Sequence, residues 1–177
     1  MALRASLNKG LTDELKLAFP SIVPVQRPEG GNVMIPDSNW VSGFTSGEGS
    51  FVISIFKSNT FTGFIVRLRF NITQHSRDAQ LMQSLVNYLG CGRYVTRSEN
   101  SNHGDFIVSS LSEITNSIIP FLKKYPIKGN KSLDFSDFCE VAKIMENKDH
   151  IREEGLNQIR LIQAGMNRNR NKNNKYS

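Results

Sequence analysis

The sequence has few cysteines and no long hydrophobic run. Its 177 residues include two cysteines, Cys91 and Cys139, whose spacing matches no metal-binding pattern. Such isolated cysteines are typical of small buried residues in a reducing compartment. No apolar stretch approaches the ~20 residues that a membrane-spanning helix requires, so we expect no membrane partner. The first ten residues lack the apolar centre of a signal peptide, and Asp13 and Glu14 follow closely, so we predict no cleaved presequence.

The chain also lacks an acidic excess. It carries 22 basic and 16 acidic residues, a net charge of +6, which suggests a polyanionic partner. Residues 50–110 hold six basic and three acidic residues, mostly on predicted strands, whereas residues 1–49 and 111–165 are nearly balanced. The segment 166–177 holds four basic residues and no acidic one. A basic, asparagine-rich terminus is more often a solvated end than a binding arm, so we predict a disordered tail there.

The chain contains enough apolar residues for one domain. Hydrophobic residues make up 38% of it, which suits a globular core. Residues 1–36 contain one possible short helix, Leu11 to Phe19, and are then punctuated by prolines and glycines. We predict that residues 1–36 form a linker-like extension and that residues 37–165 form the domain.

The first helix of this domain contains an unusual pair of glycines. Asp37 or Ser38 is a good N-cap residue, and Gly49 is expected to end the helix. Gly43 and Gly47 are four residues apart and therefore lie on one face. Each glycine costs about 1 kcal/mol relative to alanine inside a helix. The pair is therefore better explained by another backbone that approaches this face closely.

After Ser50 the apolar period changes from helical spacing to two. Strands are predicted at about 50–56 and 64–73, followed by a helix at 77–89 and strands at 93–98 and 105–109. A helix that begins near residue 112 and is interrupted or restarted at Pro120 follows, and further helices are predicted at 131–147 and 151–165. The order helix, hairpin, helix, hairpin, helices predicts an α+β domain with one small antiparallel sheet.

One face of this sheet is predicted to stay open. In the strand 64–73, Arg67, Arg69 and Asn71 alternate with a strong apolar row. Such a row also occurs on ordinary solvated strands, but arginine and asparagine have the donor geometry to recognise guanine and adenine edges. The third strand is ambiguous, because Arg93 and Arg97 alternate with Thr96 and Ser98. The other residues that we assign to a DNA-binding surface are Ser54, Phe56, Ser58, Thr73, Thr96, Ser98, His103, Asp105 and Ile107.

Glu48 has an unfavourable position at the end of the first helix. Exposed carbonyls make the field there negative, which disfavours a carboxylate by about 0.3–1 kcal/mol unless a cation offsets it. Glu48 could be an exposed residue of a helix-to-strand turn. Alternatively, a divalent ion could reverse the balance, because this carboxylate and the carbonyl of Gly49 are hard oxygen ligands that suit Mg²⁺.

The stretch from Trp40 to Phe51 resembles the signature of LAGLIDADG homing endonucleases, W-x-x-G-F-x-x-G-E-G-x-F. Further matches follow in order at 71–74, 90–92, 120–122 and 128–131, so the resemblance covers residues 37 to about 145. Residues 7–11 and the proline-rich segment after them resemble the linker between the halves of single-chain members. The sequence is therefore similar to the C-terminal half of a single-chain fungal mitochondrial member. It departs from such members in having one signature helix instead of two.

The resemblance implies an αββαββα domain whose curved four-stranded sheet forms half of a DNA-binding saddle. Two signature helices would pack together through Trp40, Gly43, Phe44 and Gly47. Glu48 and the Gly49 carbonyl would hold Mg²⁺, and Ca²⁺ could occupy the site without supporting cleavage. The resemblance implies that Gln74 orders solvent and that a connector lysine stabilises the transition state. Lys131 is the first candidate for that lysine and Lys128 the second.

The implied function is site-specific cleavage of double-stranded DNA by a homodimer on a palindromic or nearly palindromic target. Two alternatives remain open. The domain could bind DNA or intron RNA without cutting, or it could be a half-enzyme that needs a different partner half. The resemblance also implies an intron-encoded, mitochondrial protein.

Overall fold

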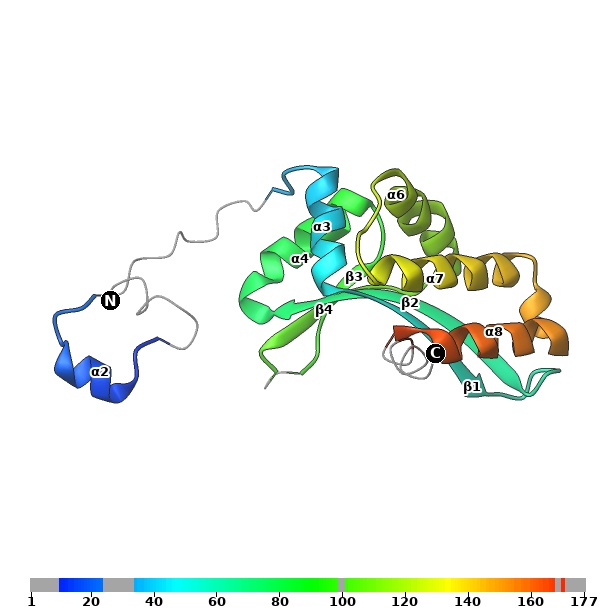
Figure 1. Ribbon diagram of the computed structural model, residues 1–177, viewed down its shortest axis with the longest axis horizontal. Helices are drawn as coiled ribbons and strands as arrows, with labels where there is room; N and C mark the ends of the chain where they lie inside the picture. Colours follow the sequence, from blue (N-terminus) through cyan, green and yellow to red (C-terminus); the bar gives the residue numbers. More distant parts are fainter. Residues whose placement is uncertain (1–9, 24–33, 99–100, 168–169, 171–177) are drawn as a thin grey trace. The chain divides into compact units, whose positions relative to one another are not determined.

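The computed structural model describes residues 10–23, 34–98, 101–167 and 170 (Figure 1). The chain divides into two units, residues 1–33 and 34–177. The first unit contains helix α2 (Asp13–Ala18), where a short helix was predicted. The hydroxyl of Thr12 caps this helix by accepting the N–H of Leu15 at 3.4 Å. The second unit begins slightly earlier than predicted, because Ile35 is buried in its core.

Helix α3 (Ser38–Glu48) leads directly into strand β1 (Gly49–Lys57). As predicted, the helix begins with an acidic cap: the carboxylate of Asp37 accepts the N–H of Asn39 at 2.7 Å and of Trp40 at 3.0 Å. Gly49 ends the helix in an extended conformation, with φ −67°. A Cβ atom at Gly49 would lie 2.6 Å from the Thr45 carbonyl oxygen. Crowding at this sharp turn therefore requires glycine.

The four strands form one antiparallel sheet in the order β1-β2-β4-β3. Strand β2 spans Phe64–His75, β3 spans Arg93–Thr96 and β4 spans His103–Val108. Helix α4 (Ala79–Leu89) connects β2 to β3 and ends at Gly90, whose φ is +64°. The two hairpins therefore meet in the centre through β2 and β4. The predicted α+β class and four-stranded sheet are confirmed.

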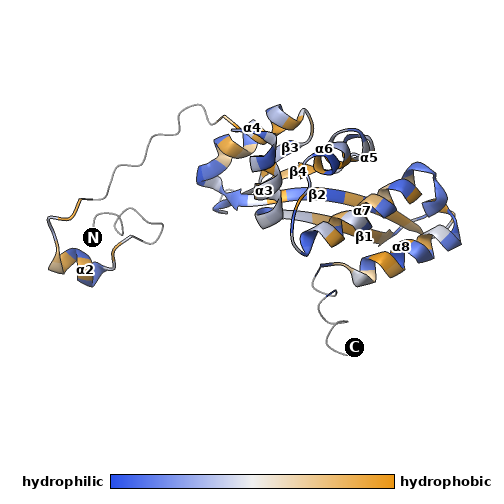
Figure 2. Ribbon diagram, turned by 45° about the horizontal axis from the view of Figure 1, so that its top comes forward, coloured by the Kyte–Doolittle hydropathy of each residue, from blue (hydrophilic) through white to orange (hydrophobic). Residues whose placement is uncertain are grey.

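The strand register gives the sheet a buried face and an open face. Residues directly opposite each other on neighbouring strands share a face, and blue and orange segments alternate along the strands (Figure 2). Phe51 faces Phe70 across β1 and β2, and their rings stack at 5.3 Å. The predicted apolar row of β2 is confirmed, because Val66, Leu68 and Phe70 are all buried.

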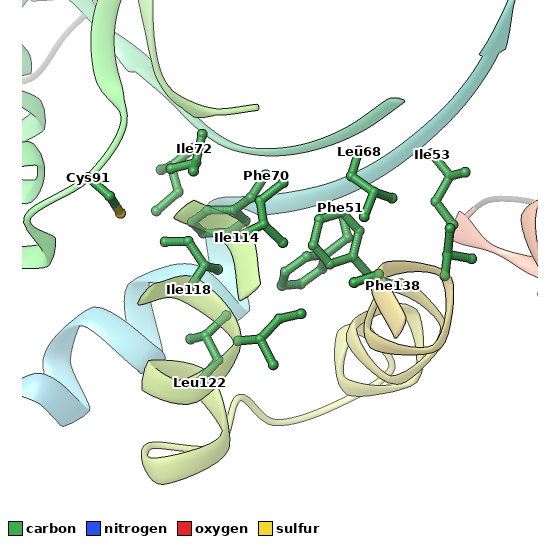
Figure 3. Close-up of a cluster of buried hydrophobic side chains, with 14 of the residues drawn as sticks. Phe51, Ile53, Leu68, Phe70, Ile72, Cys91, Ile114, Ile118, Leu122 and Phe138 are labelled. Carbon is green, nitrogen blue, oxygen red and sulfur yellow. The ribbon is translucent and has the colours of Figure 1, made fainter. Parts of the chain in front are cut away.

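Helices cover the buried face. In Figure 1, α3, α4, α6 (Ile119–Lys124) and α7 (Lys131–Glu146) lie on the same side of the curved sheet. Figure 3 shows Ile114, Ile118, Leu122 and Phe138 pointing toward the side chains of the strands. A three-residue helix, α5 (Leu111–Glu113), and a π-helical turn at Ile114–Ile118 precede Pro120. The predicted interruption near Pro120 therefore takes the form of a widened turn.

Helix α8 (Glu153–Gly165) and the residues after it cover the outer edge of β1. The side-chain amide of Gln163 donates to the Ile53 carbonyl at 2.7 Å, and that of Asn167 donates to the Phe51 carbonyl at 3.4 Å. Both acceptors belong to an edge strand, whose outward backbone groups have no neighbouring strand.

Part of the predicted tail packs against the domain. Met166 is 3% exposed. The guanidinium of Arg170 donates to Asp134 at 2.9 Å and also contacts Asp137. The predicted disordered tail is therefore wrong for Met166, Asn167 and Arg170, and its other residues lie outside the described part. The sequence pattern showed only the positive charges, because their acidic partners are more than thirty residues away on α7. No helix in the described part is long and apolar enough to cross a membrane.

Candidate functional site

A carboxylate and an ammonium group lie at the carbonyl end of α3. Glu48, the last residue of the helix, is exposed. Lys131, the first residue of α7, donates from Nζ to the Gly47 carbonyl at 2.8 Å and to the Thr45 carbonyl at 3.4 Å. Burial lowers the pKa of Lys131, while the charges of Glu48 and Asp134 oppose this shift. The lysine therefore places a positive charge where backbone carbonyls converge.

The other candidate lysine contacts the helix through its backbone. The N–H of Lys128 donates to the Ser46 hydroxyl at 3.1 Å, and that hydroxyl donates to the Ser42 carbonyl at 2.8 Å. The Lys128 side chain itself is exposed and has no partner in the described residues. The structure thus brings the ammonium of Lys131 to the end of α3, whereas it uses the backbone of Lys128 to fix the connector.

Gln74 lies on the helix side of the sheet. It is two residues beyond Ile72, which pairs with Gly49 at the start of β1. Its side chain is partly buried, and its amide has no hydrogen-bond partner among residues 10–23, 34–98, 101–167 and 170. The amide is therefore free to bind solvent on the face that α3 covers.

The glycine face of α3 is open. Gly43 and Gly47 are exposed, and a Cβ atom added at either position would meet nothing within 4 Å. Trp40 and Phe44 belong to the same helical face, and their rings stack at 5.1 Å. Packing among the described residues therefore explains neither glycine, and the close backbone approach predicted from the sequence stays a prediction.

The open face of the sheet carries most of the predicted DNA contacts. Arg67 lies opposite Ser54, and Asn71 lies between Ser50 and Ile107. The buried side-chain oxygen of Asn71 has no hydrogen-bond partner in the described part. The guanidinium carbon of Arg67 lies 5.7 Å from the centre of the Phe56 ring. A hollow of about 410 Å³ on this face is lined by residues that include Ser54, Phe56, Arg67, Arg69 and Ser109.

On strand β3, the open face carries Arg93 and not Thr96, which was assigned to that face from the sequence. Thr96 pairs with Gly104, whose missing side chain leaves room for the Tyr94 ring on the covered face. The prediction that Thr96 shares the open face is therefore wrong, and Ser98 lies beyond the end of β3. Arg93 pairs with Ile107 and so lies on the open face. A four-residue strand with weak alternation did not reveal this parity.

Arg97 continues the open face past the end of β3, and its backbone N–H donates to the His103 carbonyl at 3.2 Å. Its guanidinium donates to both carboxylate oxygens of Asp105, from Nε at 2.7 Å and from Nη2 at 2.9 Å. Nη2 also donates to the Thr73 hydroxyl at 3.1 Å, and this hydroxyl donates to Asp105. The bonds from Arg97 hold the pKa of Asp105 below its ordinary value. Asp105, predicted as a direct DNA contact, is thus engaged within the sheet.

Two oxygen donors at the end of α3 are chemically suited to magnesium. The Glu48 carboxylate and the Gly49 carbonyl are hard oxygen donors of the type that Mg²⁺ prefers. No cluster of three or more His, Cys, Asp or Glu occurs among the residues that the structure describes. The described residues at this end of α3 therefore supply only part of a coordination shell.

Comparisons with known proteins identify relatives along most of the chain. The family model described as LAGLIDADG endonuclease matches residues 41–142. A probable intron-encoded endonuclease 2 of Neurospora crassa is 40% identical over 186 residues, which cover 94% of this chain and 40% of that protein. A probable intron-encoded DNA endonuclease 1 of Mycosarcoma maydis is 32% identical over 114 residues, which cover 63% of this chain and 40% of that protein.

Solved structures show the same fold. The I-SmaMI LAGLIDADG homing endonuclease bound to cleaved DNA is 47% identical, with a TM-score of 0.90, and the match covers 96% of this chain and 56% of that chain. The I-LtrWI LAGLIDADG homing endonuclease bound to target DNA is 42% identical, with a TM-score of 0.88, and the match covers 94% and 55%. This chain thus spans little more than half of these enzymes. Because the family model matches more than half of its residues, the chain belongs to the LAGLIDADG endonuclease family.

Proposed function

We propose that the chain is a site-specific double-strand DNA endonuclease that acts as a homodimer on a palindromic or nearly palindromic target. The observation that carries the proposal is that exposed Glu48 ends α3 at the same carbonyls to which the Lys131 ammonium donates, beside an open glycine face. Two such helices packed through this face would bring two carboxylates together. A two-fold axis between the copies requires a target of the same symmetry.

Different groups of the chain would have separate roles at the scissile phosphate. The Glu48 carboxylate and the Gly49 carbonyl would hold Mg²⁺, which supplies Lewis-acid activation of water and of the leaving oxygen. The ammonium of Lys131 would stabilise negative charge that develops on the phosphate. The amide of Gln74, which has no partner among the described residues, would orient solvent on the covered side of β2.

The open sheet face would bind DNA in the major groove. Arg67 and Arg69 lie on one row of β2. Asn71 continues the row, and its side-chain oxygen has no partner within the described part of the chain. Phosphate contacts would dominate the affinity and make it fall with salt, whereas base contacts would select the sequence. The structure of I-SmaMI bound to cleaved DNA supports this use of the fold.

A second candidate is a half-enzyme that pairs with a different partner half. Its support is the length of the relatives, because this chain covers 40% of the Neurospora protein and 56% of I-SmaMI. Size-exclusion chromatography with light scattering separates the two candidates. A dimer of this chain supports self-pairing, and a strict monomer supports a different partner. The names of the relatives support an intron-encoded origin, and a mitochondrial location stays a prediction from the resemblance.

A cleavage selection with a matched pair of variants tests the proposed activity. The purified chain is incubated with a randomised palindromic double-stranded DNA library and Mg²⁺, and the cleaved molecules are sequenced. Glu48→Gln should abolish cleavage and preserve binding measured with Ca²⁺. Glu146→Gln is the control, because Glu146 is also the last, exposed residue of its helix but lies far along α7 from Lys131. Specific binding without cleavage in any divalent ion would instead show a non-cleaving module.

A further inference from the structure

Among the described basic side chains on the open face of the sheet, that of Arg97 makes the most hydrogen bonds. Its three hydrogen bonds to Asp105 and Thr73 join the residue that follows β3 to β4 and β2 in one network. The Asp105 side chain is 12% exposed and that of Arg97 is 53% exposed. The carboxylate in this network is therefore nearly buried, whereas the guanidinium reaches the surface.

The hydrogen bonds leave a defined part of the guanidinium available. Arginine has five N–H donors. The bonds to Asp105 and Thr73 use those of Nε and Nη2, and no residue in the described ranges engages the two N–H groups of Nη1. Because the fork is fixed by its partners, ordering it on a ligand costs little additional side-chain entropy. The remaining donors are therefore presented to the open face in one orientation.

The charge of this network favours a base over a phosphate. Arg97 and Asp105 form a bidentate ion pair, so together they add no net charge to the face. A neutral pair releases few counterions from DNA and contributes little to nonspecific affinity. In the major groove, guanine presents two acceptors, N7 and O6, at one edge. A fixed Nη1 donor in a network without net charge can donate to one of these acceptors, whereas a phosphate contact would favour an arginine whose charge is not neutralised.

We propose that Arg97 is a specificity-determining residue that donates from Nη1 to a guanine in the major groove, with Asp105 and Thr73 as positioning residues. The inference rests on the proposed function and extends it, because it assigns one base pair of each half-site to one network. It also gives the partly buried carboxylate of Asp105 a role in recognition without direct contact with the electronegative DNA.

The test measures base preference at every position of the target. The full chain is allowed to bind a randomised double-stranded DNA library in Ca²⁺, the bound fraction is sequenced, and the selected site is used for competition and salt titrations. Arg97→Lys retains the charge but removes the fork, and Asp105→Asn retains the shape but removes the ionic fixation. Arg152→Lys is the control, because Arg152 also has an aspartate partner, Asp149 at 4.0 Å, but lies outside the sheet.

Both network variants should lose preference for guanine at the same single position of each half-site. We expect a loss of roughly fivefold for Arg97→Lys, the low end of the range for arginine–guanine contacts, because Nη1 alone makes the contact. The loss for Asp105→Asn should be smaller. Arg97→Lys should leave the salt dependence unchanged, whereas Asp105→Asn should make it no weaker, because this substitution leaves the positive charge of Arg97 without its neutralising partner. The control variant should select the same site as the unmodified chain.

Three results would overturn the inference. A uniform loss of affinity at all positions with a weaker salt dependence would show a phosphate contact. Unchanged preferences together with lower resistance to urea would show that the network only clamps β3 to the sheet. If the unmodified chain selects no sequence, the proposed function fails and the inference fails with it, whereas selective binding that survives both substitutions refutes the inference alone.

Discussion

Replacing Lys131 with methionine should affect catalysis far more than folding. The ammonium offsets the carbonyl end of α3, an effect worth about 0.3–1 kcal/mol for a cation at a helix terminus. Burial lowers the pKa of Lys131, so folding already disfavours its charge, and this offsets part of the gain. Methionine retains most of the aliphatic contacts. We therefore expect Lys131→Met to change the free energy of unfolding by about 1 kcal/mol or less.

The expected effect on cleavage is much larger. Loss of one preorganised group that stabilises transition-state charge typically lowers kcat by about 10²–10³-fold, or roughly 3–4 kcal/mol. This exceeds the stability effect by about threefold, so partial unfolding cannot account for it. The measurements are single-turnover cleavage of the selected site at saturating protein, and urea unfolding of the same samples.

Lys128→Met is the matched control for this experiment. Lys128 is exposed and contacts α3 only through its backbone N–H, which the substitution leaves in place. Its cleavage rate should therefore stay within a few-fold of that of the unmodified chain. The reasoning would be refuted if Lys128→Met caused the larger loss of rate, or if the rate of Lys131→Met fell only in proportion to its folded fraction.

Two further predictions concern assembly and acid stability. Gly47→Leu should convert the expected dimer to a monomer in light scattering without reducing the stability of the single chain, because a Cβ atom at this exposed position meets nothing within 4 Å among the described residues, whereas a leucine would block a close helix approach. A dimer that survives would argue against assembly through α3. The pKa of Asp105 is held below its ordinary value of 3.8 by Arg97, so its carboxylate stabilises the fold above that value, and the stabilisation is lost as the pH falls through the folded pKa. Asp105→Asn should therefore lower the free energy of unfolding by about 1–2 kcal/mol near neutral pH, a range that allows for the half-exposed arginine. The loss should be clearly smaller at about pH 3. An equal loss at both pH values, measured by urea unfolding, would contradict this ion pair.

The sequence predicted the fold well because the strong signals are local. The alternation along β2 alone separates Val66, Leu68 and Phe70 from Arg67 and Arg69, and the register confirms both rows. The Asp37 cap and the glycine at the turn into β1 are likewise determined within a few residues. Strand order and the end of the domain were less accessible, because they depend on contacts between residues that are distant in the sequence.

The candidate site shows the same division. Glu48 could be singled out because its own helix creates the unfavourable field, whereas the choice between Lys128 and Lys131 required the geometry of the connector. The role of Arg97 was missed because its partner Asp105 is eight residues away across a hairpin, and the short strand β3 gave no clear parity. Asp134 and Arg170 are even farther apart, so a packed segment was predicted to be disordered.

The amide contacts at the outer edge of β1 have a consequence for how copies of the chain can join. Gln163 and Asn167 occupy the carbonyls of Ile53 and Phe51, which an added strand would need as acceptors. These contacts prevent a strand of another molecule from pairing with the outer edge of β1. Edge strands that are covered in this way are protected from aggregation. A chain truncated after Gly165 would lose the Asn167 contact and become more prone to self-association through the outer edge of β1.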